Sequence, residues 1–168
     1  VRPEQPGRLA EIRFNATDIQ GLPKSVQQAS WNVNTAQPVG HGARVIGQWY
    51  DRDGQPTGLP AMLISERGAY LSHIVLNDDP AGKRQLLAAV LGHLSTPLWK
   101  QMAQAALSKL DRIGHYEDLE QLEKQLKTGS NAEAAQLLQA AKTSLARTKE
   151  LIQEGKFADA VETAHKAR

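Results

Sequence analysis

The protein is 168 residues long and nearly balanced in charge, with 20 Lys and Arg against 18 Asp and Glu, which gives a formal net charge of +2 at pH 7. The two signs are interleaved, whereas nucleic-acid binding requires a patch of one sign, so no nucleic-acid partner is expected. The chain has no cysteine, which excludes disulfides, thiolate metal sites and a cysteine nucleophile. No apolar run approaches the roughly 20 residues of a membrane span, so no such span is expected.

Residues up to about 76 show the apolar periodicity of strands. Leu9–Phe14 alternates between apolar and polar residues, as a strand with one buried face does. Ser25–Val33 and Arg44–Tyr50 are the next two predicted strands. Ala61–Ser65 and Ala69–Leu76 are almost continuously apolar, which predicts that both of their faces are covered. Because short polar turns separate the strands, we expect a mainly antiparallel sheet.

The turn after the third predicted strand, Asp51-Arg52-Asp53-Gly54, allows two interpretations. Alternating aspartates occur in calcium-binding loops, but such a loop needs a third oxygen ligand and a distal bidentate glutamate. Gln55 follows here, and no such glutamate is present. Asp-Gly is also typical of a hairpin turn, because glycine accepts positive φ values. We therefore predict a hairpin turn and no metal site.

Beyond about residue 79 the apolar period changes from two residues to 3.6, which indicates helices. Asp79 is a favourable N-cap, and Pro80 suits the first helical position. Gly155 is expected to end a long helix and to begin the turn of an antiparallel helical hairpin. These patterns predict an α+β fold, with a sheet and two helices in residues 1–110 and a helical hairpin linker in residues 111–168.

No catalytic constellation accompanies these elements. Asp51 and Glu66 fall at the ends of strands that would be neighbours, but they are more simply interpreted as solvated turn residues, because nothing separates their pKa values. Ser72 and His73 are adjacent in a predicted strand and would face opposite sides, so they do not form a nucleophile–base pair. His73 is interpreted as a partly buried, hydrogen-bonded residue. No metal ligand set and no other cofactor site is expected, since no two of the five histidines are spaced i, i+4.

The tryptophans and tyrosines of the sheet region are Trp31, Trp49, Tyr50 and Tyr70. Rings on an exposed sheet can stack on the apolar faces of sugars, but aromatic residues are also ordinary core residues. Trp49 shares a strand face with Val45, which favours burial, whereas Tyr50 and Tyr70 are expected to be exposed. The candidate ligand contacts at this end of the sheet are Trp49, Tyr50, Asp51, Arg52, Tyr70 and His73.

The segments Gln48–Ala61 and Arg67–Asp79 resemble a region of some large bacterial family-ten-like glycosylhydrolases. The resemblance continues in Lys83–Gly92 and Pro97–Trp99. In those proteins the region is the end of a glutamine-amidotransferase-like α/β domain, which is similar to the oligomerisation domain of some β-galactosidases. The stretch from residue 113 to 168 resembles the helical hairpin that leads into their hydrolase barrel.

The resemblance implies a non-catalytic accessory or assembly module of a carbohydrate-active protein, with a second copy or an adjoining hydrolase domain as partner. No catalytic residue carries over, because the amidotransferase nucleophile is a cysteine and the acids of the hydrolase belong to its barrel. Two alternatives stay open: a carbohydrate-binding module that uses the sheet aromatics, and a small free-standing glycoside hydrolase. The sequence leaves the compartment open, and a secreted or periplasmic location would follow from a glycosylhydrolase parent.

Overall fold

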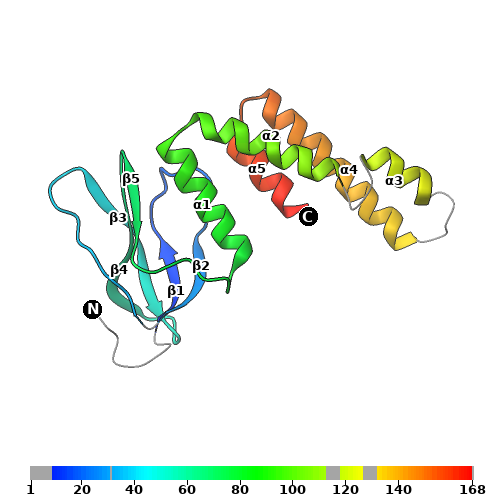
Figure 1. Cartoon of the computed structure of the whole chain (residues 1–168). Helices are drawn as coiled ribbons and strands as arrows, with labels where there is room; N and C mark the ends of the chain where they lie inside the picture. Colours follow the sequence, from blue (N-terminus) through cyan, green and yellow to red (C-terminus); the bar gives the residue numbers. More distant parts are fainter. Residues whose placement is uncertain (1–8, 31, 113–117, 127–131, 168) are drawn as a thin grey trace. The chain divides into compact units, whose positions relative to one another are not determined.

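The protein consists of two compact units, Val1–Leu94 and Ser95–Arg168. The computed structural model describes residues 9–30, 32–112, 118–126 and 132–167, so Trp31 lies outside the described residues. In its described part, the first unit contains a five-stranded sheet and helix α1 (Pro80–Leu94), which packs beside β2 (Figure 1). The described part of the second unit is helical.

The sheet is antiparallel and has the strand order β2-β1-β3-β4-β5. Its strands are β1 (Leu9–Phe14), β2 (Ser25–Ser30), β3 (Ala43–Asp51), β4 (Pro56–Ser65) and β5 (Gly68–Leu71). The order leaves β2 and β5 at the two edges. An antiparallel sheet followed by helices is the α+β class expected from the change of apolar period, so the predicted fold class is confirmed.

The interior of the first unit is built from neighbouring strands of the sheet. Leu9, Ile12, Val26, Ile46 and Trp49 are each at most 1% exposed. Ile12 is the cross-strand partner of both Val26 and Trp49, so β2, β1 and β3 all contribute to this core. The register of β3 against β4 shifts at several points, and such irregularities bend a sheet.

Strand β5 is shorter than predicted. The sequence predicts a strand over Ala69–Leu76, but β5 ends at Leu71. The Ser72 N–H still bonds the Ala61 carbonyl of β4 at 2.9 Å, while the Ser72 carbonyl accepts from the N–H of Asn34 at 2.8 Å. The chain then turns away from β4 and runs past β2, so the residues after Ser72 have no ladder to join.

The prediction that both late strands are covered on both faces holds for β4 and is wrong for β5. In β4 the consecutive residues 61–64 are all buried. By contrast, large apolar side chains of β5 and the segment after it are exposed: Tyr70 at 40%, Ile74 at 72% and Val75 at 46%. The physical reason is position, because Tyr70 is in an edge strand with a neighbour on one side only, and Ile74 and Val75 lie beyond the end of β5, outside the sheet.

The connection between β3 and β4 is the predicted hairpin. The Asp51 N–H donates to the Gln55 carbonyl at 3.0 Å, and the Gly54 N–H donates to the Asp51 carbonyl at 3.2 Å. The Asp51 carboxylate accepts from the N–H groups of Asp53 (3.0 Å) and Gln55 (2.8 Å). Gly54 has a φ of 74°, which requires glycine here. Asp51 is therefore a turn-forming residue.

Helix α1 begins as predicted. The Asp79 carboxylate accepts from the N–H of Gly82 at 2.9 Å, which is the bond that an N-cap makes to the third helical residue. Pro80 occupies the first helical position. A Cβ on Gly82 would lie 2.3 Å from the Asp79 carboxylate, so the missing side chain lets the cap approach.

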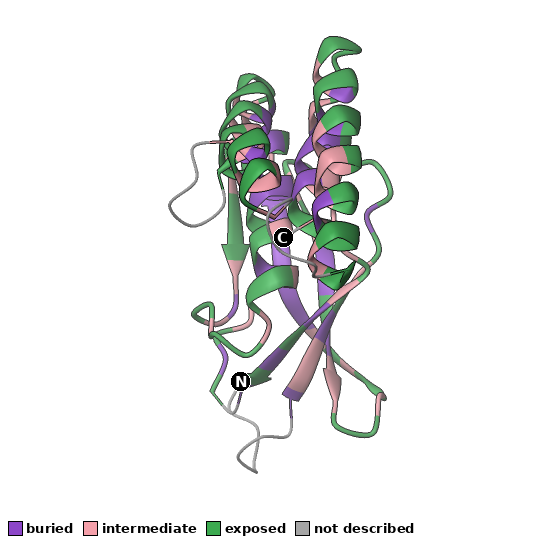
Figure 2. Cartoon of the chain, turned by 90° about the vertical axis from the view of Figure 1, so that its right-hand side faces the viewer, coloured by how far each residue is buried: buried purple, intermediate pink, exposed green. Residues whose placement is uncertain are grey.

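The second unit contains α2 (Pro97–Asp111), α3 (Leu119–Leu126), α4 (Ala132–Gln153) and α5 (Phe157–Lys166) in its described part. Figure 2 shows that these helices carry buried and exposed residues on different sides. Ala106 and Leu110 of α2 pack with Ala164 of α5 and with Leu145 of α4. Because α2 packs on the hairpin, the compact units divide between residues 94 and 95, whereas the sequence pattern predicts a boundary after residue 110.

The α4–α5 turn has the hydrogen bonds of a Schellman motif. The Gly155 N–H donates to the Ile152 carbonyl at 3.1 Å, and the Lys156 N–H donates to the Leu151 carbonyl at 2.8 Å. Gly155 has a φ of 75°, a left-handed conformation that glycine adopts without strain. This confirms the predicted helix break at Gly155.

Replacing Gly155 with alanine is expected to lower the free energy of unfolding by about 1–2 kcal/mol, the usual cost of a left-handed conformation for a residue with a Cβ. The cost is conformational, since no atom lies within 4 Å of the added Cβ. Gly155→Asn is the matched control, because asparagine tolerates this conformation better. Urea unfolding should rank the proteins as wild type, then the asparagine variant, then the alanine variant; equal stability of all three would contradict the account.

Candidate functional site

Trp49 lies in the core and cannot contact a ligand at the surface. It is 0% exposed, and its Nε1–H donates to the hydroxyl of Ser72 at 2.7 Å. The hydroxyl is itself buried, so the bond satisfies two polar groups that water cannot reach. The inclusion of Trp49 among the ligand contacts is therefore corrected, in line with the strand face that it shares with Val45.

Tyr50 is half-buried, and an arginine covers its ring. The guanidinium carbon of Arg13 lies 4.1 Å from the ring centroid, in a cation–π arrangement. Arg13 also donates to the carboxylate of Glu11 at 2.7 Å, and Glu11 is the cross-strand partner of Tyr50. Burial alone would raise the pKa of Glu11, but hydrogen bonds from Ser25 and Arg13 outweigh it and lower that pKa. Arg13, Glu11 and Tyr50 thus form one polar cluster beside the hairpin of Asp51 and the exposed Arg52.

Tyr70 is not part of that cluster. Tyr70 is the cross-strand partner of Leu63, which pairs with Val45 on β3. Val45 and Tyr50 are five positions apart along β3, a separation of roughly 16 Å. The structure therefore does not bring the two tyrosines together, although both were expected at one end of the sheet.

The two turn carboxylates are also far apart. Asp51 ends β3, whereas Glu66 follows Ser65, whose partner Ala43 begins β3. The length of β3 separates them by roughly 25 Å, while the paired acids of glycoside hydrolases lie about 5–9.5 Å apart. Asp51 and Glu66 therefore do not form an acid pair.

Tyr70 of β5 and two residues of the segment that follows this strand have exposed apolar side chains; we call Tyr70, Ile74 and Val75 together the Tyr70 surface. Its tyrosine is held in place, because the hydroxyl of Tyr70 donates to the carbonyl of Asn34. Its isoleucine is held through the backbone, because the Nε2 of Gln28 donates to the Ile74 carbonyl at 2.8 Å. The surface is thus apolar, exposed and fixed at both ends.

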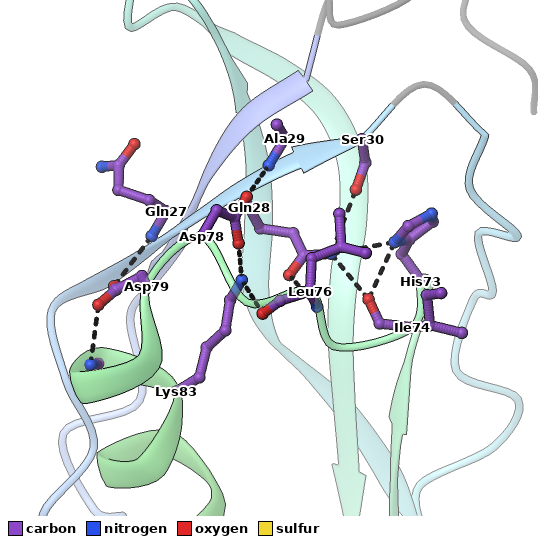
Figure 3. A network of polar contacts seen from close by, with 11 residues as sticks. Gln27, Gln28, Ala29, Ser30, His73, Ile74, Leu76, Asp78, Asp79 and Lys83 are labelled. Atoms are coloured by element: carbon purple, nitrogen blue, oxygen red, sulfur yellow. Dashed lines mark hydrogen bonds and ion pairs between the residues drawn. The ribbon is translucent and has the colours of Figure 1, made fainter.

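His73 lies between these residues and is half-buried, as predicted (Figure 3). Its Nδ1 is 3.0 Å from the Nε2 of Gln28 and 3.0 Å from the carbonyl of Ile74. Gln28 is 1% exposed and also donates to the hydroxyl of Ser30 at 3.3 Å. His73 and Ser72 have different partners and lie beyond the end of β5, so they form no nucleophile–base pair.

The residues that follow His73 are held against β2 by side chains (Figure 3). The carboxylate of Asp78 accepts from the N–H of Ala29 at 2.6 Å, and that of Asp79 accepts from the N–H of Gln27 at 3.2 Å. Lys83 of α1, only 4% exposed, donates to the Leu76 carbonyl at 2.8 Å and forms an ion pair with Asp78.

The pKa of Asp78 reflects this arrangement. Burial would raise the pKa, but the hydrogen bonds from Lys83 and from the N–H of Ala29 outweigh burial, so the pKa of Asp78 is lowered. A lowered pKa means that the ionised carboxylate stabilises the fold above the ordinary carboxyl range and that this contribution is lost as the pH falls.

This network is not among the features predicted from the sequence. One signal was present, since Lys83 falls on the apolar stripe of α1 together with Leu86 and Val90. A lysine on such a stripe is either at its margin or buried with a partner, and here it is buried.

The helical unit contains an open pocket of about 400 Å³. Its lining includes Asp118, Leu119, Lys142, Leu145 and Lys149. Charges of both signs line the pocket, and Lys142 already forms a 2.5 Å ion pair with Glu123. The pocket therefore presents no concentration of one charge to a ligand.

Across the described residues, no three His, Cys, Asp or Glu side chains lie close enough together to hold a metal ion. Within the same part of the chain, no helix combines the length and the apolar character needed to cross a membrane. Comparisons of the chain with protein-family models, with curated proteins and with solved structures gave no match.

Proposed function

We propose that this protein is a non-catalytic assembly module, which associates with a second copy through the Tyr70 surface. The observation that carries the proposal is the exposure of Tyr70, Ile74 and Val75, at 40%, 72% and 46%, within six consecutive residues of the chain. Clustered large apolar side chains at a surface are typical of protein contacts. The resemblance to the accessory region of glycosylhydrolases supports an assembly role within a carbohydrate-active protein.

The hydrogen bonds behind this surface favour association. Tyr70 is fixed by the Asn34 carbonyl, and the backbone of Ile74 is fixed by Gln28. A surface that is ordered before binding loses less conformational entropy when the partner arrives. Branched aliphatic side chains also suit a protein partner better than a sugar, because they offer neither a flat ring nor a polar group for hydroxyls.

The assembly proposal is tested by sedimentation equilibrium of the 168-residue protein. The wild type should self-associate as its concentration rises, and the variant Tyr70→Ala/Ile74→Ser/Val75→Ser should remain monomeric, because it removes the apolar contact. Leu137→Ser is the matched control, since Leu137 is 66% exposed but lies on α4. A wild type that stays monomeric, or a triple variant that associates as the wild type does, would contradict the proposal.

A carbohydrate-binding module is the second candidate. It is supported by the cluster of Arg13, Glu11 and Tyr50 beside the exposed Arg52, where an aromatic edge and charged groups lie together. Against it, the guanidinium of Arg13 covers a face of the ring that a sugar would use. Calorimetric titration with oligosaccharides of glucose, galactose and N-acetylglucosamine distinguishes the candidates: binding that is lost in Arg52→Ala and kept in the triple variant would favour this candidate.

A further inference from the structure

The edge strand β2 has backbone N–H groups that no strand satisfies. Gln27 and Ala29 are two positions apart, so their N–H groups point to the same side of β2. That side faces away from β1, because both groups donate to aspartates that lie outside the sheet. Unpaired groups along an edge are a template for the addition of another strand.

The segment of residues 74–79, which we call the strap, covers this edge. Asp78 and Asp79 supply the acceptors that the carbonyls of a neighbouring strand would otherwise supply. The side chain of Gln28 makes two further bonds, donating to the Ile74 carbonyl and accepting from the Leu76 N–H. Among the described residues, every hydrogen bond found between β2 and the strap involves a side chain. The cover is therefore a set of side-chain bonds and not a sixth strand.

The charges around the strap are few. Asp78 and Asp79 lie on the strap itself, with His73 just before it. Lys83 of α1 supplies the ion pair to Asp78. Strand β2 has no charged side chain in Ser25–Ser30. The two carboxylates are thus the anionic groups that stand at the outer side of an otherwise neutral strand.

A neutral strand with its N–H groups on one side is suited to pairing with its own copy. In an antiparallel pair centred on Gln28, Gln27 of one copy lies opposite Ala29 of the second copy. Both residues then exchange two backbone hydrogen bonds, and no like charges are placed opposite each other. The occupant that best matches this edge is therefore a second β2.

We propose that the strap blocks strand pairing at the β2 edge and that the carboxylates of Asp78 and Asp79, which we call the latch, hold it there. Removal of both carboxylate charges lets β2 pair antiparallel with β2 of a second copy. This association differs from the one at the Tyr70 surface, because it uses backbone groups of β2 and not the side chains of Tyr70, Ile74 and Val75, although Ile74 and Val75 also lie on the strap.

The variant Asp78→Asn/Asp79→Asn tests the latch, with Tyr70→Ala in the background, which weakens the Tyr70 surface and leaves the strap residues 74–79 otherwise unchanged. The amides of Gln27 and Ala29 should exchange with solvent at least about tenfold faster than in the background protein. Sedimentation equilibrium should detect a dimer. The charge-matched control Asp53→Asn/Glu66→Gln, in the same background, should show neither change, since both residues are exposed and outside the network.

A third variant identifies the edge. Adding Ala29→Pro to the double asparagine variant removes an outward N–H and should restore the monomer. Should the double asparagine variant fail to fold, the single variant Asp79→Asn, which keeps a good helix cap, replaces it. Exchange should then rise at Gln27 and stay unchanged at Ala29, which Asp78 still holds, and equal exchange at both amides in this variant and the background would contradict the role of Asp79. The proposal is overturned if the latch variant folds and stays monomeric, at any exchange rate of Gln27 and Ala29, or if it associates equally well with proline at position 29.

Discussion

Replacing Trp49 with alanine is expected to lower the free energy of unfolding of the sheet unit by about 3–5 kcal/mol, the usual cost of removing a buried aromatic side chain. Trp49 is fully buried and is the cross-strand partner of Ile12, so the cavity would open in the centre of the core. The buried hydroxyl of Ser72 would lose its donor at the same time. The measurement is urea unfolding followed by circular dichroism.

Trp49→Phe separates the two contributions. Phenylalanine retains much of the buried apolar area but cannot donate to Ser72, so this variant is expected to lose about 1–3 kcal/mol. Adding Ser72→Ala should recover part of that loss, because the unsatisfied hydroxyl is then removed as well. If the alanine variant at position 49 unfolds at the same urea concentration as the wild type, the side chain of Trp49 is not in the core.

Replacing Asp78 with alanine is expected to lower the free energy of unfolding by about 2–4 kcal/mol. The variant leaves the ammonium of Lys83, whose side chain is 5% exposed, without its anionic partner. It also removes the acceptor for the N–H of Ala29. The side chain of Asp78 is 31% exposed, which places the expected loss below that of a fully buried pair.

Replacing the other partner of the ion pair, as in Lys83→Met, should lower the free energy of unfolding much less, by about 1 kcal/mol or below. Methionine fills the buried site, and Asp78 remains accessible to water. The destabilisation by Asp78→Ala should also shrink as the pH falls below the ordinary carboxyl range, since the lowered pKa makes the contribution of Asp78 depend on its ionised form. Equal losses for the two substitutions, or a loss for Asp78→Ala that does not change with pH, would contradict the buried ion pair.

Features with local causes could be predicted from the sequence. The Asp-Gly hairpin, the Asp79 cap and the break at Gly155 each depend on a few adjacent residues, and all three are present as expected. The change of apolar period likewise separates sheet from helices, because it is set by which side of each element faces a core.

Features that depend on strand order could not be predicted in this way. Tyr50 and Tyr70 are expected at one end of the sheet because both are aromatic residues near strand ends, but the register puts Tyr70 opposite Leu63, which in turn pairs with Val45. The end of β5 depends on Ser72 accepting a bond from Asn34, a residue far away along the chain. The network that holds the strap joins residues of β2, the strap and α1, which are far apart along the chain, so no short stretch of sequence contains it.

The burial of Trp49 was favoured by its strand face, but its hydrogen bond to Ser72 was not predicted. The residues of the candidate site therefore lie in separate places: Trp49 in the core, Tyr50 with Arg13 near the hairpin, and Tyr70 of β5 with Ile74 and Val75 of the segment that follows it. The last of these parts supports an assembly role.

The most direct measurement of that role is fluorine NMR of protein labelled with 3-fluorotyrosine, recorded over a series of protein concentrations. The resonances are assigned with Tyr50→Phe and Tyr70→Phe variants. If the Tyr70 surface binds a second copy, the Tyr70 resonance should shift or broaden as the concentration rises, while that of Tyr50, which lies beneath Arg13, should not. A Tyr70 resonance that stays unchanged up to the solubility limit would contradict assembly through this surface.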